Sequence, residues 1–191
     1  MDLNFSLLAG RHRHHLLGGL AICFYAIHGG YYLLNAYPWG LLWCCHLAAV
    51  LVGMGLILQW PTLNAIGFLW LCIGNSLWVL DLATGGEFIR TSTFTHIGGF
   101  LIGIYGIRTL GMPGSVWYKA LFSFFILQLL SRWVTPAPEN INVAFAVWGG
   151  WESSFSSYFW YMALLYGLFA LVFWGLERSL QRWSPPLGMG S

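Results

Sequence analysis

The sequence predicts an all-α, polytopic membrane protein: one transmembrane domain over residues 1–191, with six transmembrane helices and both termini in the cytoplasm. Three observations predict this class: the composition, six apolar stretches, and the placement of the basic residues. Hydrophobic residues make up 58% of the chain and charged residues 7%, whereas roughly 25% charged is usual in soluble domains. The net charge of +2 is too small to indicate a nucleic-acid partner. We expect membrane lipids, and a membrane-protein partner, instead.

The apolar stretches set the number of helices. A helix needs about 20 mostly apolar residues to cross a bilayer. Tyr37-Pro38, Trp60-Pro61 and Gly111–Gly114 mark tight connections between stretches. The long connections run over 81–94 and 132–157. The predicted helices are Leu16–Leu34, Trp39–Leu58, Leu63–Leu80, Thr95–Leu110, Val116–Ser131 and Tyr158–Leu176.

The basic residues predict the orientation. Lys and Arg near helix ends favour the cytoplasmic side. With the N-terminus inside, only Arg90 and Arg132 lie outside. The residues then placed on the cytoplasmic side are Arg11, Arg13, Arg108, Lys119, Arg178 and Arg182. This bias predicts a multi-pass protein with its two long loops facing outward, and it suits any plasma membrane. We expect a bacterial inner (plasma) membrane.

Three histidines and an aspartate, His28, His46, His96 and Asp81, are expected to gather near the outer face. At 1.5 Å per residue, His28 and His46 both lie roughly 10 Å below the outer boundary. A tight turn joins their helices, so we expect the two imidazoles to be close. Asp81 ends the third predicted helix on that side, and His96 begins the fourth. Ionisable groups in a bilayer usually face a cavity, a partner or a pathway.

Helical phase indicates which of these side chains point inward. His46 shares a helix face with Ala49 and Gly53, and His96 shares one with Gly99, Gly103 and Gly106. Small residues at this spacing let a neighbouring helix approach closely. We therefore expect His46 and His96 to face other helices rather than lipid.

One function that this cluster fits is a lipid acyl-ester hydrolase or acyltransferase working in the outer leaflet. Acyl transfer needs a nucleophile, a base and a group that orients the base. His96 or His46 would be the base, and Asp81 would orient it. Cys45 would be the nucleophile, with Cys44 and Ser76 as alternatives.

A second function that the cluster fits is binding of haem, pigment or a metal ion in an accessory subunit of a larger membrane complex. His28, His46 and His96 would then be the metal ligands, because imidazole suits Zn, Cu, Fe and Ni. Transport through the helices is a third class, although few polar residues continue toward the inner side. The residues alone leave open whether the chain is an enzyme and which cofactor it holds.

The segment from His46 to Gly99 also carries a set of short motifs. These are His46-Leu47-Ala48, Leu56-Ile57-Leu58 with Pro61, Leu80-Asp81-Leu82, Gly86-Glu87-Phe88 and Thr95-His96-Ile97-Gly98-Gly99. In this order they resemble the YwaF-type bacterial integral membrane proteins, which are distantly similar to the androgen-induced hydrolase group.

The resemblance implies a six-helix membrane fold and acyl-ester chemistry with His96 as general base, and it makes His46 the second position of interest. The chain departs from the pattern in two places. Ala48 stands where some relatives carry a Cys, and no proline precedes Asp81.

Overall fold

The computed structural model describes residues 2–183, with side chains from residue 10 onward. Over this range the chain forms helices and short helical turns and contains no strand, so the predicted all-α class is confirmed. Residues 1 and 184–191 of the predicted domain lie outside this range. The six α-helices are α1 (Asp2–Leu34), α2 (Cys44–Ile57), α3 (Pro61–Ala83), α4 (Gly99–Leu110), α5 (Val116–Val134) and α6 (Tyr158–Trp183).

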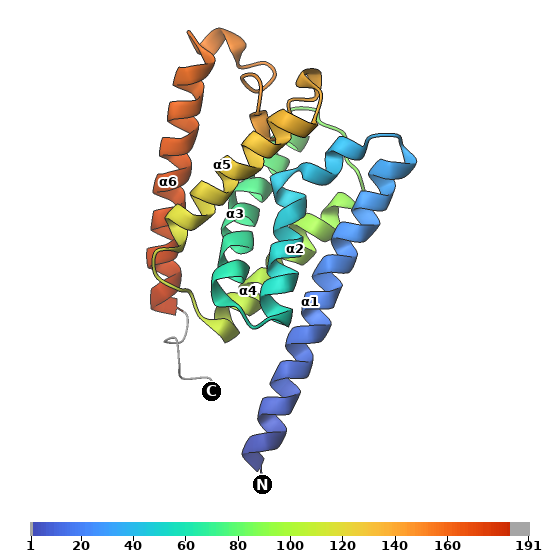
Figure 1. Cartoon of the computed structure of the whole chain (residues 1–191), viewed down its shortest axis with the longest axis vertical. Helices are drawn as coiled ribbons and strands as arrows, with labels where there is room; N and C mark the ends of the chain where they lie inside the picture. The colour runs from blue at the N-terminus through green and yellow to red at the C-terminus, as the bar shows by residue number, and fades with distance from the viewer. Residues whose placement is uncertain (1, 184–191) are drawn as a thin grey trace.

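The helices run up and down along one long axis (Figure 1). α1 begins and α6 ends toward the lower end of the view, and the turns from α2 to α3 and from α4 to α5 lie in the same half. The three other connections, residues 35–43, 84–93 and 135–157, lie at the upper end, which we call the loop end. Because the connections alternate between the two ends, consecutive helices run in opposite directions.

Close backbone contacts hold α2 against its neighbours. A Cβ atom added at Gly53 of α2 would lie 2.6 Å from the carbonyl oxygen of Gly18 of α1, and the reverse distance is the same. A Cβ atom at Gly67 of α3 would lie 2.6 Å from the carbonyl oxygen of Ala48. Side chains larger than hydrogen would push these helices apart, so the glycines set how closely they pack.

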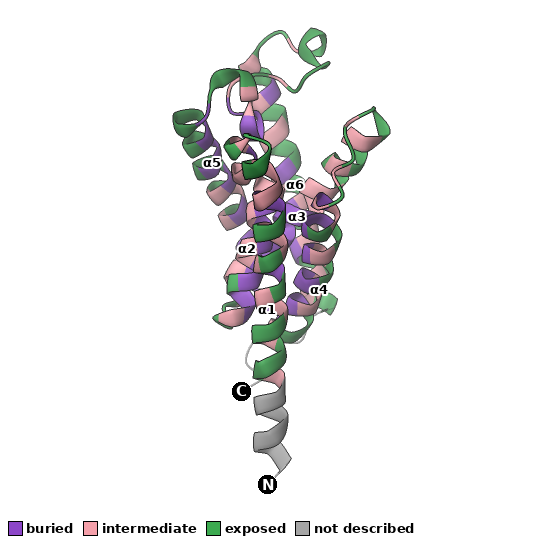
Figure 2. Cartoon of the chain, turned by 90° about the vertical axis from the view of Figure 1, so that its right-hand side faces the viewer, coloured by how far each residue is buried: buried purple, intermediate pink, exposed green. Residues whose placement is uncertain are grey.

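Buried residues concentrate where α2, α3 and α4 meet (Figure 2). Many large apolar side chains are exposed on the outer surface. Phe122 of α5 and Leu171 of α6 are examples of large apolar side chains left exposed. Three helical segments are long and apolar enough to span a membrane: Gly10–Leu34, Pro61–Ala83 and Tyr158–Trp183. A soluble protein rarely exposes apolar surface on this scale.

The predicted second helix was wrong at its start. The prediction began it at Trp39, but Pro38–Leu42 forms a separate 3-10 turn, η1, and α2 begins only at Cys44. Trp43 between them is extended, with φ −57° and ψ 132°. The fourth predicted helix also divides, into a π-helical turn η2 (Phe94–Gly98) followed by α4. Both changes fall at histidines of the expected cluster.

Candidate metal centre at the loop end

His46 lies in the first turn of α2, directly after the break from η1. Its side chain is buried, and its Nδ1 lies 2.9 Å from the carbonyl oxygen of Gly40 in η1. A carbonyl only accepts hydrogen bonds, so Nδ1 carries the proton and donates it. In the neutral ring this leaves Nε2 as the nitrogen with a lone pair. The break before α2 thus fixes both the orientation and the tautomer of His46.

His28 reaches His46 from α1. Their Nε2 atoms are 3.1 Å apart, and both side chains are buried. Because His46 Nε2 accepts, His28 donates from its Nε2. The other nitrogen of His28, Nδ1, lies 2.8 Å from the hydroxyl of Thr91 in the α3–α4 connection, and that hydroxyl donates to it. The contact between His28 and His46 that their matched depth predicted is therefore present.

His96 approaches from the π-helical turn η2. Its Nδ1 donates to the carbonyl oxygen of Ser92 over 2.9 Å. Its Nε2 is buried and has no hydrogen-bond partner among the described residues. A π-turn leaves backbone carbonyls without their usual helical partners, and Asn75 of α3 donates its Nδ2 to the carbonyl oxygen of His96 over 3.1 Å. Ser92 and Asn75 together hold the His96 ring in place and leave the lone pair of its Nε2 without a partner among the described residues.

Cys45, His46 and His96 converge. One ligand atom from each residue lies within 4.8 Å of the other two. His46 and His96 both have Nδ1 tied to a backbone carbonyl, so the nitrogen that each offers is Nε2. His28 is not one of these three residues but contacts His46 through Nε2, and its Nδ1 is also tied to an oxygen. We call Cys45, His46, His96 and His28 the loop-end cluster.

Aromatic rings enclose the loop-end cluster. Trp78 of α3 stacks on the ring of His96, with centroids 4.7 Å apart and planes 10° from parallel. Tyr32 of α1 lies against His28 and His46, at centroid distances of 4.6 Å and 5.5 Å. These rings keep water away from the nitrogens, so the cluster sits in an apolar and enclosed setting.

Asp81, the fourth residue of the expected cluster, makes its described contacts elsewhere. It lies in the last turn of α3, where its carboxylate packs against Gly86 and its backbone carbonyl accepts from the amides of Thr84 and Gly86. The structure shows no hydrogen bond from its carboxylate to a histidine within the described residues. The groups that orient the histidines are instead the carbonyls of Gly40 and Ser92 and the hydroxyl of Thr91, which sequence reasoning missed.

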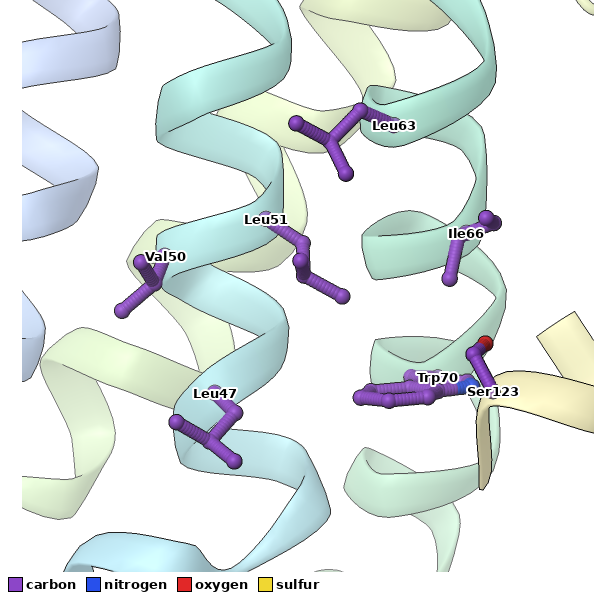
Figure 3. A pocket seen from close by; sticks show the side chains of 7 residues that line it. All are labelled: Leu47, Val50, Leu51, Leu63, Ile66, Trp70 and Ser123. Atoms are coloured by element: carbon purple, nitrogen blue, oxygen red, sulfur yellow. The ribbon is translucent and has the colours of Figure 1, made fainter. Parts of the chain in front are cut away.

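Two grooves also interrupt the apolar packing, and neither is lined by the loop-end cluster. The first, of about 240 Å³, lies between α2, α3 and α5 and is lined by Ser123 and apolar side chains (Figure 3). The second, of about 370 Å³, lies between α3 and α6 and includes Cys72 and Ser76. Ser76, an alternative nucleophile in the sequence prediction, therefore lines a groove between α3 and α6.

Comparison of the chain with protein-family models, with curated proteins and with solved structures found no match.

Proposed function

We propose that this protein is a multi-pass plasma-membrane protein that holds a transition-metal ion of the zinc class in its loop-end cluster. Cys45, His46 and His96 would supply three ligands and His28 the fourth. The observation that carries the proposal is the convergence of ligand atoms from Cys45, His46 and His96, with the His96 Nε2 lone pair buried and unpaired.

The partners of the other ring nitrogens support this reading. Histidines that bind metals almost always donate their second ring N–H to a carbonyl, a carboxylate or water, which fixes the tautomer and the ring orientation. His46 has Gly40 in this position and His96 has Ser92. His28 has the hydroxyl of Thr91, which can either donate or accept. His28 can therefore move its proton to Nδ1 and present its Nε2 to an ion.

The spacing of the nitrogens favours a single ion. With Zn–N bonds of 2.0–2.1 Å, two tetrahedral nitrogen ligands lie roughly 3.3 Å apart. The Nε2 atoms of His28 and His46 are 3.1 Å apart. Two axial histidines of a haem or chlorin lie on opposite sides of the macrocycle, whereas the rings of His28 and His46 are in direct contact, with centroids 4.4 Å apart. A thiolate with several imidazoles suits zinc or copper better than magnesium or calcium.

The membrane placement rests on three supports. Three helices are long and apolar enough to cross a bilayer. The connections alternate between two ends (Figure 1). The basic residues favour the end opposite the loop end. α2 and α4 are shorter, but each packs among other helices, so they need not match the full bilayer thickness alone. We propose six crossings, with both termini cytoplasmic and the cluster in the outer leaflet.

Metal analysis tests the proposal. Protein purified from membranes, stripped with a chelator and titrated with Co²⁺ should bind one equivalent and show the absorption of tetrahedral cobalt, with a thiolate-to-cobalt charge-transfer band. Cys45→Ser should lose that band. Cys72→Ser is the matched control, because Cys72 lies on α3 outside the cluster, and it should keep the band. A wild-type protein that binds no Co²⁺ would contradict the proposal.

Acyl-ester chemistry is the second candidate, because the thiol of Cys45 and the free nitrogen of His96 lie in the same 4.8 Å group. His96 would take the thiol proton as sulfur attacks the ester carbonyl, and would return it to the departing alcohol. The resulting thioester would then pass its acyl group to water or to a second alcohol. Ser92 holds the base in the tautomer that this requires.

Acyl labelling separates the two candidates. Incubation with a radiolabelled phospholipid in membranes should leave a hydroxylamine-sensitive acyl group on Cys45 if this chemistry occurs. Cys45→Ser should abolish the label and Cys72→Ser should retain it. If His46→Ala and His96→Ala both leave lipid turnover unchanged, the enzyme candidate fails.

A further inference from the structure

The connection between α5 and α6 reaches across the molecule to the start of α2. We infer that Asn142, which belongs to this connection, positions the metal ligands of α2 by fixing the break between η1 and α2. Asn142 is not itself a ligand. The inference rests on the proposed metal site and assigns a positioning role within it.

The side-chain amide of Asn142 bridges the two sides of the break. Its Oδ1 accepts the backbone N–H of Cys44 over 2.8 Å, and its Nδ2 donates to the carbonyl oxygen of Leu42 over 2.8 Å. Nδ2 also donates to the hydroxyl of Ser131 on α5 over 2.9 Å. The side chain is 4% exposed, so each of these contacts is sheltered from water. One buried amide thus joins η1, α2 and α5.

The start of α2 needs such a partner. The first backbone N–H groups of a helix have no acceptor within the helix, and a Ser, Thr, Asp or Asn at the cap usually supplies one. Here the cap residue is Trp43, and no side-chain cap bond is present. Asn142 takes over that role from a position far along the chain. The residues that follow directly are Cys45 and His46.

The same break orients the side chain of His46. η1 must end close to the first turn of α2 for the carbonyl of Gly40 to accept the proton of His46 Nδ1. Because Asn142 holds Leu42 on one side and Cys44 on the other, it fixes the angle between η1 and α2. Without the Asn142 side chain, the first turn of α2 can either merge with η1 into one helix or lose its helical hydrogen bonds. Either change moves Cys45 and His46 relative to His96.

The connection is itself firmly placed. η4 (Ile141–Val143) packs on α5, where Gln128 donates to the carbonyl oxygen of Asn142 over 3.0 Å. The hydroxyl of Tyr158 donates to the carbonyl oxygen of Val143 over 2.7 Å. Nearby, burial and then a hydrogen bond to the Glu139 carboxylate raise the pKa of Tyr37 to about 12. A second contact thus ties the connection to the α1–η1 turn.

Asn140 provides a matched control. It also has a positive φ, 44° against 56° for Asn142, and its side chain also makes three hydrogen bonds to backbone atoms or neighbours. All of them stay inside the connection, with the amides of Phe145 and Ala146 and the carbonyl of Ala146. Replacing either asparagine removes similar local support, but only Asn142 contacts the start of α2.

The test compares Co²⁺ binding by the wild type, Asn142→Ala and Asn140→Ala, each purified as the full chain, with thermal unfolding measured in parallel. Loss of a group that orients a metal ligand typically lowers metal affinity about 10- to 100-fold. We expect this loss, and a changed cobalt spectrum, for Asn142→Ala. Asn140→Ala should lower the unfolding temperature but keep the wild-type affinity and spectrum.

The outcomes separate the two proposals. A wild-type protein that binds no Co²⁺ contradicts the metal site itself. A wild type that binds Co²⁺, with both variants keeping its affinity and spectrum, contradicts only the positioning role of Asn142. Equal losses of affinity in both variants also contradict it, because the effect would then come from the connection as a whole. If Asn142→Ala does not fold, Asn142→Asp keeps the acceptor for the Cys44 amide and is tested in the same way.

Discussion

At the residue scale, buried polar side chains in this apolar chain are satisfied by groups that lie outside the helix or helical turn carrying them. Each histidine of the loop-end cluster turns Nδ1 toward an oxygen and leaves Nε2 for the cluster. Glu177 of α6 follows the same rule at the opposite end. It is buried, and its two carboxylate oxygens accept the amides of Ser115 and Trp117 over 2.9 Å and 2.8 Å.

Glu177 therefore caps α5 from another helix, because Ser115 is left-handed and makes no side-chain cap bond. Glu177→Ala removes the acceptor of two amides at the start of α5, and a hydrogen bond to a charged group contributes about 1.5–3 kcal/mol. We expect a clear fall in the free energy of unfolding, measured by thermal or denaturant unfolding in detergent micelles. Glu152→Ala, at an exposed position in the α5–α6 connection, is the control. Equal stability of the two variants would show that Glu177 does not cap α5.

At the element scale, glycine contacts between helices decide where the histidines meet. α1 carries His28 and α2 carries His46, and these helices cross where Gly18 meets Gly53. The contact is backbone against backbone, so no rotamer change relieves an added methyl group. The helix spacing set there also sets the 3.1 Å between the two Nε2 atoms.

Gly18 and Gly19 offer a paired test of this contact. A Cβ atom at Gly18 would lie 2.6 Å from the carbonyl oxygen of Gly53, whereas one at Gly19 meets nothing within 4 Å. Gly18→Ala should destabilise the protein by about 1–3 kcal/mol through overpacking and weaken Co²⁺ binding. Gly19→Ala should be neutral or stabilising by about 0.5–1 kcal/mol, since alanine favours helix. Unfolding and cobalt titration of both variants check this, and similar behaviour of the two would argue against the contact.

The element scale also shows where sequence reasoning stops. Apolar runs in the sequence located all six helices, because each run can be recognised from neighbouring residues alone. They misplaced the start of the second helix, because Gly40 alone is a weak signal and the residues from Leu41 to Cys44 are all apolar. The break depends on Asn142, whose side-chain amide oxygen accepts the backbone N–H of Cys44 although the two residues are 98 positions apart in sequence. A local pattern contains no trace of such a contact.

At the scale of the whole molecule, the alternation of connections predicts which segments face each side of the membrane. Gly149, in the connection at the loop end, and Gly114, in the turn between α4 and α5, have room for a side chain. In intact cells, Gly149→Cys should react with a membrane-impermeant maleimide, and Gly114→Cys should react only after permeabilisation. The wild-type chain, with cysteines in apolar stretches, gives the background. The reverse labelling pattern would invert the proposed topology.

The sequence by itself determined the all-α class, the number of helices and two inward-facing histidines, His46 and His96. These follow from hydrophobicity and helical phase, which depend on neighbouring residues. The sequence also predicted that His28 and Cys45 lie near these two. Only the tertiary structure decided which ring nitrogens meet, that Asp81 stays with its own turn, and that Gly40, Ser92 and Thr91 orient the rings. Carbonyl and hydroxyl partners have no sequence signature, because any residue has a carbonyl. Chain packing alone selects which one faces an imidazole.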